Sequence, residues 1–186
     1  MKVGILGGTF DPVHNAHLAM ARVALAALAL DRVLWIPTGS PGYRKAPVAS
    51  PADRVAMLEL AVDGEPRYAI DERELSPQAS GYTVDTLREL RRELGPAAEL
   101  FLLLGGDQYA AFAKWREPEE VASLATPAVF ARPGFPVEGK AVKTLFMPLM
   151  AISASEIRGR VARGESIAGL VPTAVAAYIE RHALYR

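Results

Sequence analysis

The first 37 residues alternate between strand-like and helix-like apolar segments, and this alternation restricts the fold more than any other feature. Residues 2–6 form a short apolar run that ends in two glycines. After Pro12 the chain is rich in Ala, Leu and Met for about four helical turns, and residues 32–36 form a second strand-like run that ends at Pro37. This pattern predicts a βαβ unit, whose crossover is almost always right-handed and whose two strands are parallel.

The same alternation continues along the chain. Ser50 precedes Pro51, and Asp53 follows Ser50 by three residues, which is typical of a helix start; this helix should run to about residue 62. Further strands are predicted at residues 67–71, 99–104, 128–131 and 142–147, and further helices at residues 83–94, 155–163 and 173–183.

The most apolar run, residues 99–104, lacks polar alternation, which favours a central parallel strand that is covered on both faces. A chain of 186 residues can bury one substantial core. We therefore expect a single domain over residues 1–186. Its predicted class is α/β, an open doubly wound parallel sheet with C-terminal helices, and ligands of such sheets bind outside the carboxyl ends of the strands.

The composition excludes several kinds of function. Lys plus Arg equals Asp plus Glu at 21 each, so no positive excess is available to follow a nucleic-acid polymer. A single nucleotide remains compatible, because it needs only a few local donors such as N–H groups at helix starts. The absence of cysteine excludes disulfides, thiolate nucleophiles and cysteine-based zinc sites.

The apolar stretch at residues 18–30 is too short to span a bilayer and is interrupted by Arg22. The apolar run at the start of the sequence is also too short for the core of a signal peptide. We therefore expect a cytoplasmic location and no membrane partner. A homo-oligomer is compatible with the sequence.

The loop after the first predicted strand carries the strongest functional signal, and it reads Gly7-Gly8-Thr9-Phe10-Asp11-Pro12-Val13-His14-Asn15-Ala16-His17. Its two histidines are spaced i, i+3 in a first helical turn, so they share a face beside the positive end of the helix dipole, which suits an anion. Nucleotidyl transfer depends on such fixed donors around phosphorus. The alternative is that His14 and His17 only cap the helix or bond within the core.

This loop resembles the signature of the nucleotidylyltransferase superfamily, especially that of the nicotinate mononucleotide adenylyltransferases. Their signature usually contains His-x-Gly-His, and Ala16 replaces the glycine here. The resemblance implies a Rossmann-like nucleotidylyltransferase fold in which both histidines act in catalysis. It also implies that the loop binds ATP through Gly7, Gly8, Thr9, Phe10, His14 and His17.

A second segment, Ile152-Ser153-Ala154-Ser155-Glu156-Ile157-Arg158, is similar to the Ser/Thr-rich motif that opens a late helix in this family, although Ala154 and Ser155 replace the commonest Ser-Thr pair. Ser153 or Ser155 can cap the helix, while its N–H groups and Arg158 hold the β- and γ-phosphates. The resemblance implies that ATP is bound by Ile152, Ser153, Ser155 and Arg158, and that Arg158 is also catalytic. The alternative is an ordinary N-cap with a solvated arginine.

Two further blocks resemble parts of the family that contact the second substrate. Residues 80–87 are similar to Ser-Tyr-Thr-x-Asp-Thr-Leu with Gly81 inserted, which implies that Tyr82 and Thr83 contact nicotinate mononucleotide. A helix start suits the nicotinate carboxylate. The alternative is that Thr83 is an N-cap and Tyr82 a surface aromatic.

The block from Gly105 to Asp107, followed by Trp115, resembles the family's Gly-x-Asp and tryptophan. It implies that Gly105 and Asp107 bind ATP, Asp107 through ribose hydroxyls, and that Trp115 stacks on the pyridine ring. The alternative for Trp115 is a core filler.

Lys45 occupies the place of the lysine in the family's second-strand loop, although the usual Pro-Pro-His-Lys is absent. The resemblance implies that Lys45 is catalytic and that Lys45 and Thr9 also contact nicotinate mononucleotide. Arg44 can share the role of Lys45. The alternative is a solvated loop.

The resemblance implies transfer of AMP from ATP to nicotinate mononucleotide, which yields deamido-NAD and pyrophosphate in NAD biosynthesis. Mg²⁺ is expected to travel with ATP, held by phosphates and water, so no metal-ligating residue is predicted. Nicotinamide mononucleotide or phosphopantetheine are alternative acceptors, and a nucleotide sensor without turnover is an alternative of another class. The sequence lacks Gly-x-Gly-x-x-Gly and Gly-x-x-x-x-Gly-Lys-Ser/Thr, which disfavours a dinucleotide dehydrogenase and a P-loop NTPase.

Overall fold

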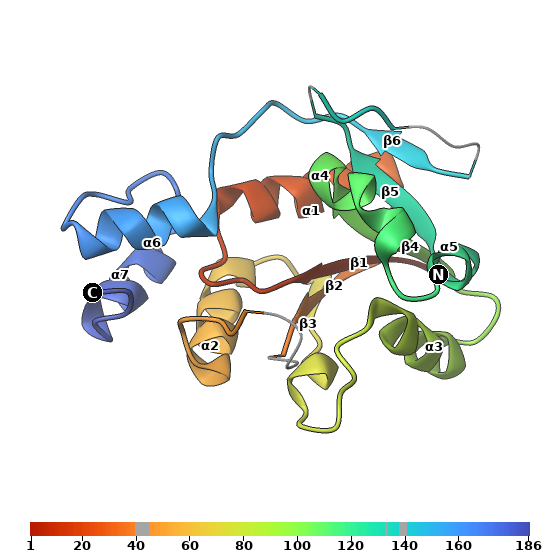
Figure 1. Ribbon diagram of the computed structural model, residues 1–186, viewed down its shortest axis with the longest axis horizontal. Coiled ribbons are helices and arrows are strands. Elements are labelled where there is room, and N and C mark those ends of the chain that lie inside the picture. Colours follow the sequence, from red (N-terminus) through yellow and green to blue (C-terminus); the bar gives the residue numbers. More distant parts are fainter. Residues whose placement is uncertain (40–44, 133, 138–140) are drawn as a thin grey trace.

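All six strands of the central sheet are parallel, in the order β3-β2-β1-β4-β5-β6 (Figure 1). The computed structural model describes residues 1–39, 45–132, 134–137 and 141–186. The strands are β1 (Lys2–Gly8), β2 (Arg32–Pro37), β3 (Tyr68–Ile70), β4 (Glu99–Gly105), β5 (Thr126–Phe130) and β6 (Lys143–Leu145).

Helices connect the strands and follow the last of them. The α-helices are α1 (Asn15–Ala27), α2 (Pro51–Val62), α3 (Thr83–Leu94), α4 (Gly106–Ala110), α5 (Pro118–Leu124), α6 (Ala154–Ala162) and α7 (Thr173–Arg181). Two 3-10 turns are η1 (Arg73–Leu75) and η2 (Phe112–Lys114). No helix within the described ranges combines the length and apolarity that crossing a membrane requires.

Both faces of the sheet are covered, α1 lying on one side and α3 with α5 on the other (Figure 1). Successive residues of β4 therefore enter different cores: Leu102 packs with residues of α3, whereas Leu103 packs with residues of α1 and α2. Two buried faces explain why β4 is apolar without alternation, because neither face of the strand meets water.

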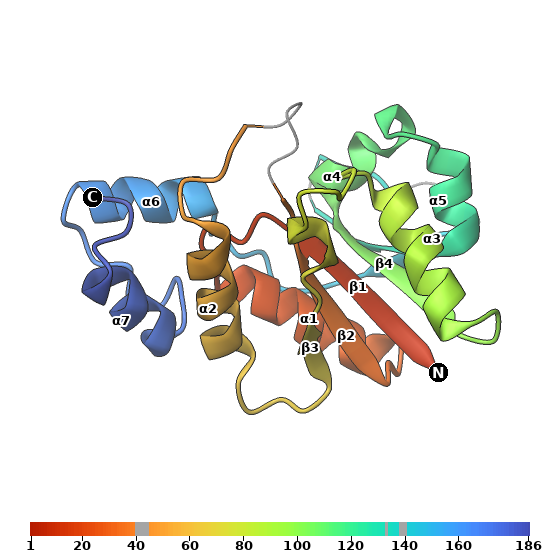
Figure 2. The ribbon, with the colours of Figure 1, turned by 90° about the horizontal axis from the view of Figure 1, so that it is seen from below.

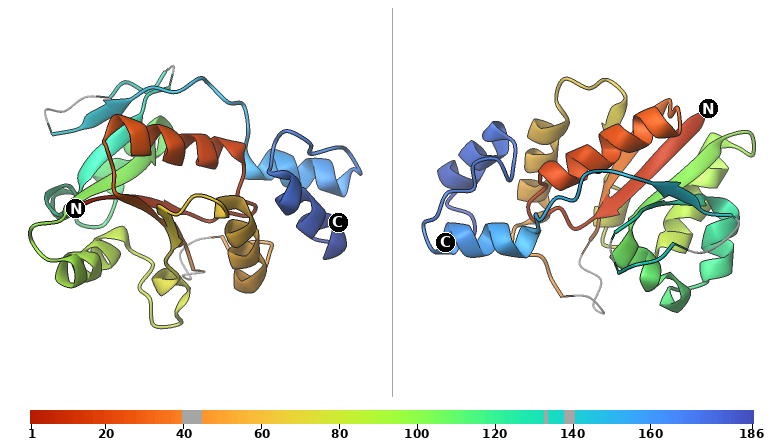
Figure 3. Two further views of the ribbon diagram at one scale, coloured as in Figure 1. Left: turned by 180° about the vertical axis from the view of Figure 1, so that it is seen from behind. Right: turned by 90° about the horizontal axis from the view of Figure 1, so that it is seen from above.

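The last two helices lie beyond the carboxyl ends of the strands, and α7 packs against α2 (Figures 2 and 3). The start of α1 is tied to the segment between them: Asn15 donates its backbone N–H to the Leu170 carbonyl at 2.9 Å and its side-chain amide to the Gly169 carbonyl at 2.8 Å. These bonds hold the segment between α6 and α7 against the start of α1.

The predicted class, an open doubly wound parallel α/β sheet with C-terminal helices, is confirmed, and the predicted segments agree with the observed ones apart from a few residues at their ends. Ser50 caps α2 by accepting the Asp53 N–H at 3.1 Å, as its position before Pro51 indicated. The prediction missed η1, α4, η2 and α5, because segments this short show no apolar helical period.

Candidate active site

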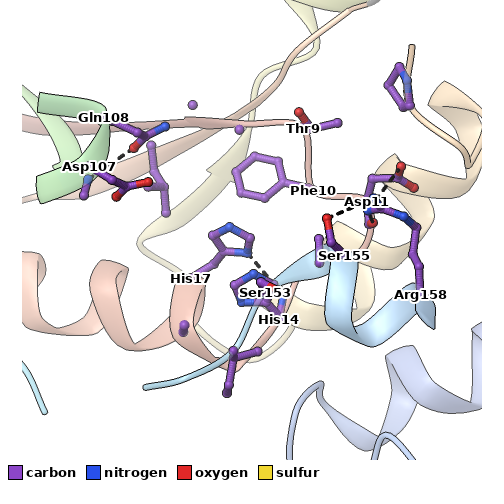
Figure 4. A pocket seen from close by; sticks show the side chains of 18 of the residues that line it. Thr9, Phe10, Asp11, His14, His17, Asp107, Gln108, Ser153, Ser155 and Arg158 are labelled. Atoms are coloured by element: carbon purple, nitrogen blue, oxygen red, sulfur yellow. Dashed lines mark hydrogen bonds and ion pairs between the residues drawn. The ribbon is translucent and has the colours of Figure 1, made fainter. Parts of the chain in front are cut away.

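The site lies where the direction of strand succession reverses, between β1 and β4. From β1 the chain builds outward to β2 and β3, then returns to β4 on the other side, which opens a crevice at the carboxyl ends of the two central strands. A cavity of about 460 Å³ occupies this position. It is lined by Lys45 and by every residue that the sequence predicted for ATP, namely Gly7, Gly8, Thr9, Phe10, His14, His17, Gly105, Asp107, Ile152, Ser153, Ser155 and Arg158 (Figure 4).

The two histidines form a stacked pair at the start of α1. His14 is the N-cap residue, and its ring lies 3.7 Å from that of His17 at an interplanar angle of 17°. His17 Nδ1 accepts the backbone N–H of His14 at 3.3 Å, so its ring proton resides on Nε2. The alternative interpretation, that His17 caps the helix, therefore holds for its Nδ1. His17 also lines the cavity, and its Nε2–H remains available as a hydrogen-bond donor.

Both imidazoles are neutral at physiological pH. Burial, and secondarily the charge of Arg132, lowers the pKa of His14 to about 4. Burial, and secondarily the His14 charge, lowers the pKa of His17 well below its ordinary value. The pair can therefore offer an N–H dipole to a phosphate but no full positive charge.

Arg158 reaches from α6 to the loop after β1 and supplies such a charge. Its Nη1 donates to the Asp11 carbonyl at 2.7 Å, and its Nη2 donates to Ser155 Oγ at 3.3 Å (Figure 4). Ser153 caps α6 by accepting the Glu156 N–H at 3.2 Å. The histidines of the first motif and the guanidinium of the second, far apart in the sequence, thus converge on one cavity.

The opposite wall is built by residues that follow β4 and β5. Gln108 Oε1 accepts the Gly105 N–H at 3.1 Å, and Arg132 Nη1 lies 3.9 Å from Asp107 Oδ1. Sequence reasoning assigned no role to Gln108 and did not consider Arg132, although Arg132 follows a predicted strand, where site residues were expected. Lys45, Arg132 and Arg158 place three cations around this cavity within the described residues.

A second cavity of about 130 Å³ meets the first at the loop after β1, since both are lined by Gly7, Gly8, Thr9 and Gln108. Thr83 and Trp115, predicted for the second substrate, line it. So does Glu74, a buried carboxylate that accepts the Thr86 hydroxyl at 2.7 Å and was missed from the sequence.

Tyr82 is placed differently from the other predicted acceptor residues. It is the N-cap residue of α3, so Thr83 begins the helix, and in the described part of the chain Tyr82 lines neither cavity. The Arg116 guanidinium covers its ring, with Cζ 4.6 Å from the centroid. Arg44, the other candidate near Lys45, lies outside the described residues.

An apolar cavity of about 220 Å³ opens off the first, with which it shares Ala16, Met20, Gly105 and Arg132. Its remaining lining is apolar, formed by Phe130, Ala131, Met147, Pro148, Leu149 and Met150. Ala16, the departure from the family's glycine, thus lies at the junction of the two spaces.

Arg54 does not line the site cavities as the described residues define them, but it supports two of the loops that do. Its side chain is fully buried, and Nη1 donates to the carbonyls of Thr9 at 2.7 Å and Thr38 at 2.8 Å. Burial lowers the pKa of Arg54, and the neighbouring Asp11 opposes that shift. The guanidinium thereby fixes the loops that follow β1 and β2, a role that the position of Arg54 within a predicted helix did not reveal.

The described residues contain no cluster of three or more His, Asp or Glu side chains that could hold a metal ion. Two carboxylates line the first cavity. Asp11 receives hydrogen bonds from its protein neighbours, and Asp107 lies near Arg132.

The fold and the site define a nucleotide-binding α/β protein, and comparison with known families agrees. The model of the family described as Cytidylyltransferase-like matches residues 5–160. Two proteins named "probable nicotinate-nucleotide adenylyltransferase" are similar over the whole chain. The chain is 45% identical to one from Thermus thermophilus, with all of both chains covered, and 44% identical to one from Chromobacterium violaceum, with 100% of this chain and 99% of the relative covered.

Among solved structures, the fold is similar to that of Plasmodium falciparum nicotinic acid mononucleotide adenylyltransferase complexed with NaAD. The TM-score is 0.82 at 19% identity, with 99% of this chain and 97% of the other covered. The chain therefore belongs to the cytidylyltransferase-like family and, within it, to the nicotinate-nucleotide adenylyltransferases.

Proposed function

We propose that the enzyme transfers AMP from ATP to nicotinate mononucleotide, forming nicotinate adenine dinucleotide (deamido-NAD) and pyrophosphate in NAD biosynthesis. One observation carries the proposal: a cation-lined cavity and a smaller cavity with an aromatic wall meet at Thr9, where two substrates could react. The names of the full-length relatives support it, as does the NaAD complex of the structural neighbour.

ATP is assigned to the larger cavity. The β- and γ-phosphates would lie at the amino end of α6, held by N–H groups near Ser153 and Ser155 and by the planar fork of Arg158. The adenine ring would enter the apolar cavity beside Ala16. Asp107 would accept ribose hydroxyls at the end of β4.

Nicotinate mononucleotide is assigned to the smaller cavity. Trp115 would stack on the pyridine ring, and the first N–H groups of α3, beside Thr83, would bind the carboxylate. Tyr82 would contribute indirectly: it is the N-cap residue of α3, so it would position the N–H groups that bind the carboxylate, and the Arg116 guanidinium covers its ring. The acceptor phosphate would then lie near Thr9, at the junction of the cavities, with Lys45 on the adjoining wall of the larger one.

In the proposed reaction, an oxygen of the acceptor phosphate attacks the α-phosphorus of ATP in line, and the bond to the bridging oxygen breaks as pyrophosphate leaves. No general base is needed, because a phosphate monoester with a second pKa of ~6 is already largely dianionic at neutral pH. His14, His17, Lys45 and Arg158 stabilise charge on the phosphates. Neutral imidazoles suit this role because they donate without exchanging a proton.

Mg²⁺ would be carried into the site by ATP rather than held there by the protein. The carboxylates of the cavity offer no cage, because Asp11 is occupied by protein donors and Asp107 lies beside Arg132. Phosphate oxygens and water are therefore the proposed ligands, and the ion would supply charge neutralisation of the triphosphate.

We also propose that residues 1–186 act as one domain, since Arg158 of α6 bonds to the loop after β1 and completes the cavity. A cytoplasmic location is proposed because the reaction consumes ATP, and a chain without cysteine needs no oxidising compartment.

The test is pyrophosphate release from ATP with each of three acceptors offered separately: nicotinate mononucleotide, nicotinamide mononucleotide and phosphopantetheine. We expect rapid release with the first and a product of the mass of nicotinate adenine dinucleotide. Faster turnover of another acceptor would reassign the substrate. Saturable ATP binding without pyrophosphate from any acceptor would make the protein a nucleotide sensor.

A further inference from the structure

Asp11 is a buried carboxylate on which segments far apart in the sequence meet. It is 3% exposed. Its Oδ1 accepts the Ala49 N–H at 3.0 Å and the Tyr185 hydroxyl at 2.8 Å, and its Oδ2 accepts the Val48 N–H at 2.7 Å. Arg158 Nη1 lies 3.8 Å from Oδ2. One side chain thus joins the loop after β1 to the segment before α2, to α6 and to the turn after α7.

These contacts hold two of the cations that line the ATP cavity. Arg158 donates to the carbonyl of Asp11 as well as pairing with its carboxylate, so Asp11 orients the guanidinium together with Ser155, to which Nη2 donates. Lys45 precedes Val48 by three residues, so the bonds to Val48 and Ala49 fix the end of the segment that carries it. Displacement of the Asp11 carboxylate would therefore displace both charges.

Tyr185 is the partner of Asp11 that lies farthest along the chain. It is 9% exposed and packs in the core, and its backbone has φ +65°, a left-handed conformation that costs a tyrosine stability. Burial and the adjacent Asp11 raise the pKa of the Tyr185 hydroxyl, so it remains a donor at physiological pH. Without this donor, Oδ1 retains the Ala49 N–H as its partner.

We propose that Tyr185 is a positioning residue for nucleotidyl transfer, which fixes the Asp11 carboxylate and through it the Arg158 guanidinium and the Lys45 segment. It acts through these residues, because Tyr185 lines none of the three site cavities in the described ranges. The proposal rests on the proposed function. It predicts that loss of the hydroxyl weakens the use of ATP and leaves recognition of the acceptor ring unchanged.

The chain offers a matched control in Tyr178, whose hydroxyl donates to Asp53 Oδ1 at 3.0 Å. Neither Tyr178 nor Asp53 lines a site cavity among the described residues. Tyr185→Phe and Tyr178→Phe therefore each remove one hydroxyl bond to a carboxylate, but only the first carboxylate contacts the site. Because the Tyr185–Asp11 bond is buried and the Tyr178–Asp53 bond is only partly buried, Tyr185→Phe is expected to lower Tm more than Tyr178→Phe.

The experiment measures kcat and KM for ATP and for nicotinate mononucleotide in both variants, together with ATP affinity by calorimetry. We expect Tyr185→Phe to lower kcat/KM for ATP about tenfold, the scale of one hydrogen bond to a charged group, with KM for the acceptor within about twofold. Tyr178→Phe should leave all kinetic constants within about twofold. Unchanged ATP constants in folded Tyr185→Phe would overturn the proposal.

A double-mutant cycle tests the route through Arg158. In an Arg158→Ala background, Tyr185→Phe should cause a smaller further loss in kcat/KM for ATP, namely the part that acts through the Lys45 segment, and full multiplicative losses would contradict the proposal. If Tyr185→Phe does not fold, Asp11→Asn disturbs the same contacts and should show the same selective loss for ATP.

If the wild-type enzyme releases no pyrophosphate, the proposed function fails, and ATP binding alone then tests the positioning role. Weaker ATP binding in Tyr185→Phe than in Tyr178→Phe would support that role. Equal binding in the two variants would refute it.

Discussion

Replacing His17 by alanine removes a donor and a helix cap at once, and the structure separates the two effects. Because Nδ1 is occupied by the His14 N–H, Nε2–H is the group left for a phosphate. Loss of one preorganised donor to transition-state charge lowers kcat by about 10²–10³. We expect this loss for His17→Ala.

The same substitution also destabilises the fold. It removes one hydrogen bond of 3.3 Å, which contributes about 0.5–1.5 kcal/mol, together with the ring contacts to His14 and Phe10. The sum is roughly 2 kcal/mol, which lowers Tm by about 4–8 °C in a chain of this size. Glutamine can restore the cap, since Gln108 at the equivalent helix position accepts the Gly105 N–H at 3.1 Å. His17→Gln should recover about 1 kcal/mol and little of the activity.

The assay combines pyrophosphate release at saturating substrates with thermal unfolding by circular dichroism, for wild type, His17→Ala and His17→Gln. Two results would refute the reasoning. One is turnover of His17→Ala within tenfold of wild type. The other is recovery of kcat in His17→Gln in step with Tm, which would make His17 a cap and nothing more.

Three further predictions follow from buried or stacked groups in the site. Burial lowers the pKa of His14 from 6.5 in the unfolded chain to about 4 in the folded one, so its contribution to stability is complete above pH 6.5 and is lost as pH falls toward 4, by up to about 3 kcal/mol. Urea unfolding across this pH range should show the decline in the free energy of unfolding, and His14→Gln should reduce it. A flat wild-type profile would contradict the prediction. Arg54→Met leaves the Thr9 and Thr38 carbonyls without their donor and should cost about 2–4 kcal/mol in thermal unfolding, whereas an unchanged Tm would argue against its supporting role. Trp115→Ala should raise KM for nicotinate mononucleotide about threefold to tenfold and leave KM for ATP unchanged, and an equal rise in both would remove the proposed stacking.

Local patterns in the sequence were sufficient to predict the class of fold and the starts of the longer helices, although not those of α4 and α5. A strand buried on both faces must be apolar at every position, which made β4 recognisable, and Ser50 before Pro51 marked α2 because capping depends on neighbours within one turn. The motifs placed His14, His17 and Arg158 at one edge of the sheet for a similar reason. Each follows a strand or opens a helix, and the carboxyl ends of parallel strands meet at the same edge.

Tertiary structure decided what surrounds those residues. Asp11 lies within the motif of residues 7–17, but its partner Tyr185 lies 174 residues away, and no local pattern encodes such a pairing. Arg116 over Tyr82 and the bonds of Arg54 to two loops are likewise long-range contacts. The protonation state of the histidines belongs to the same class, because the pKa of an imidazole depends on its burial and on nearby charges, and both arise only when distant segments pack together.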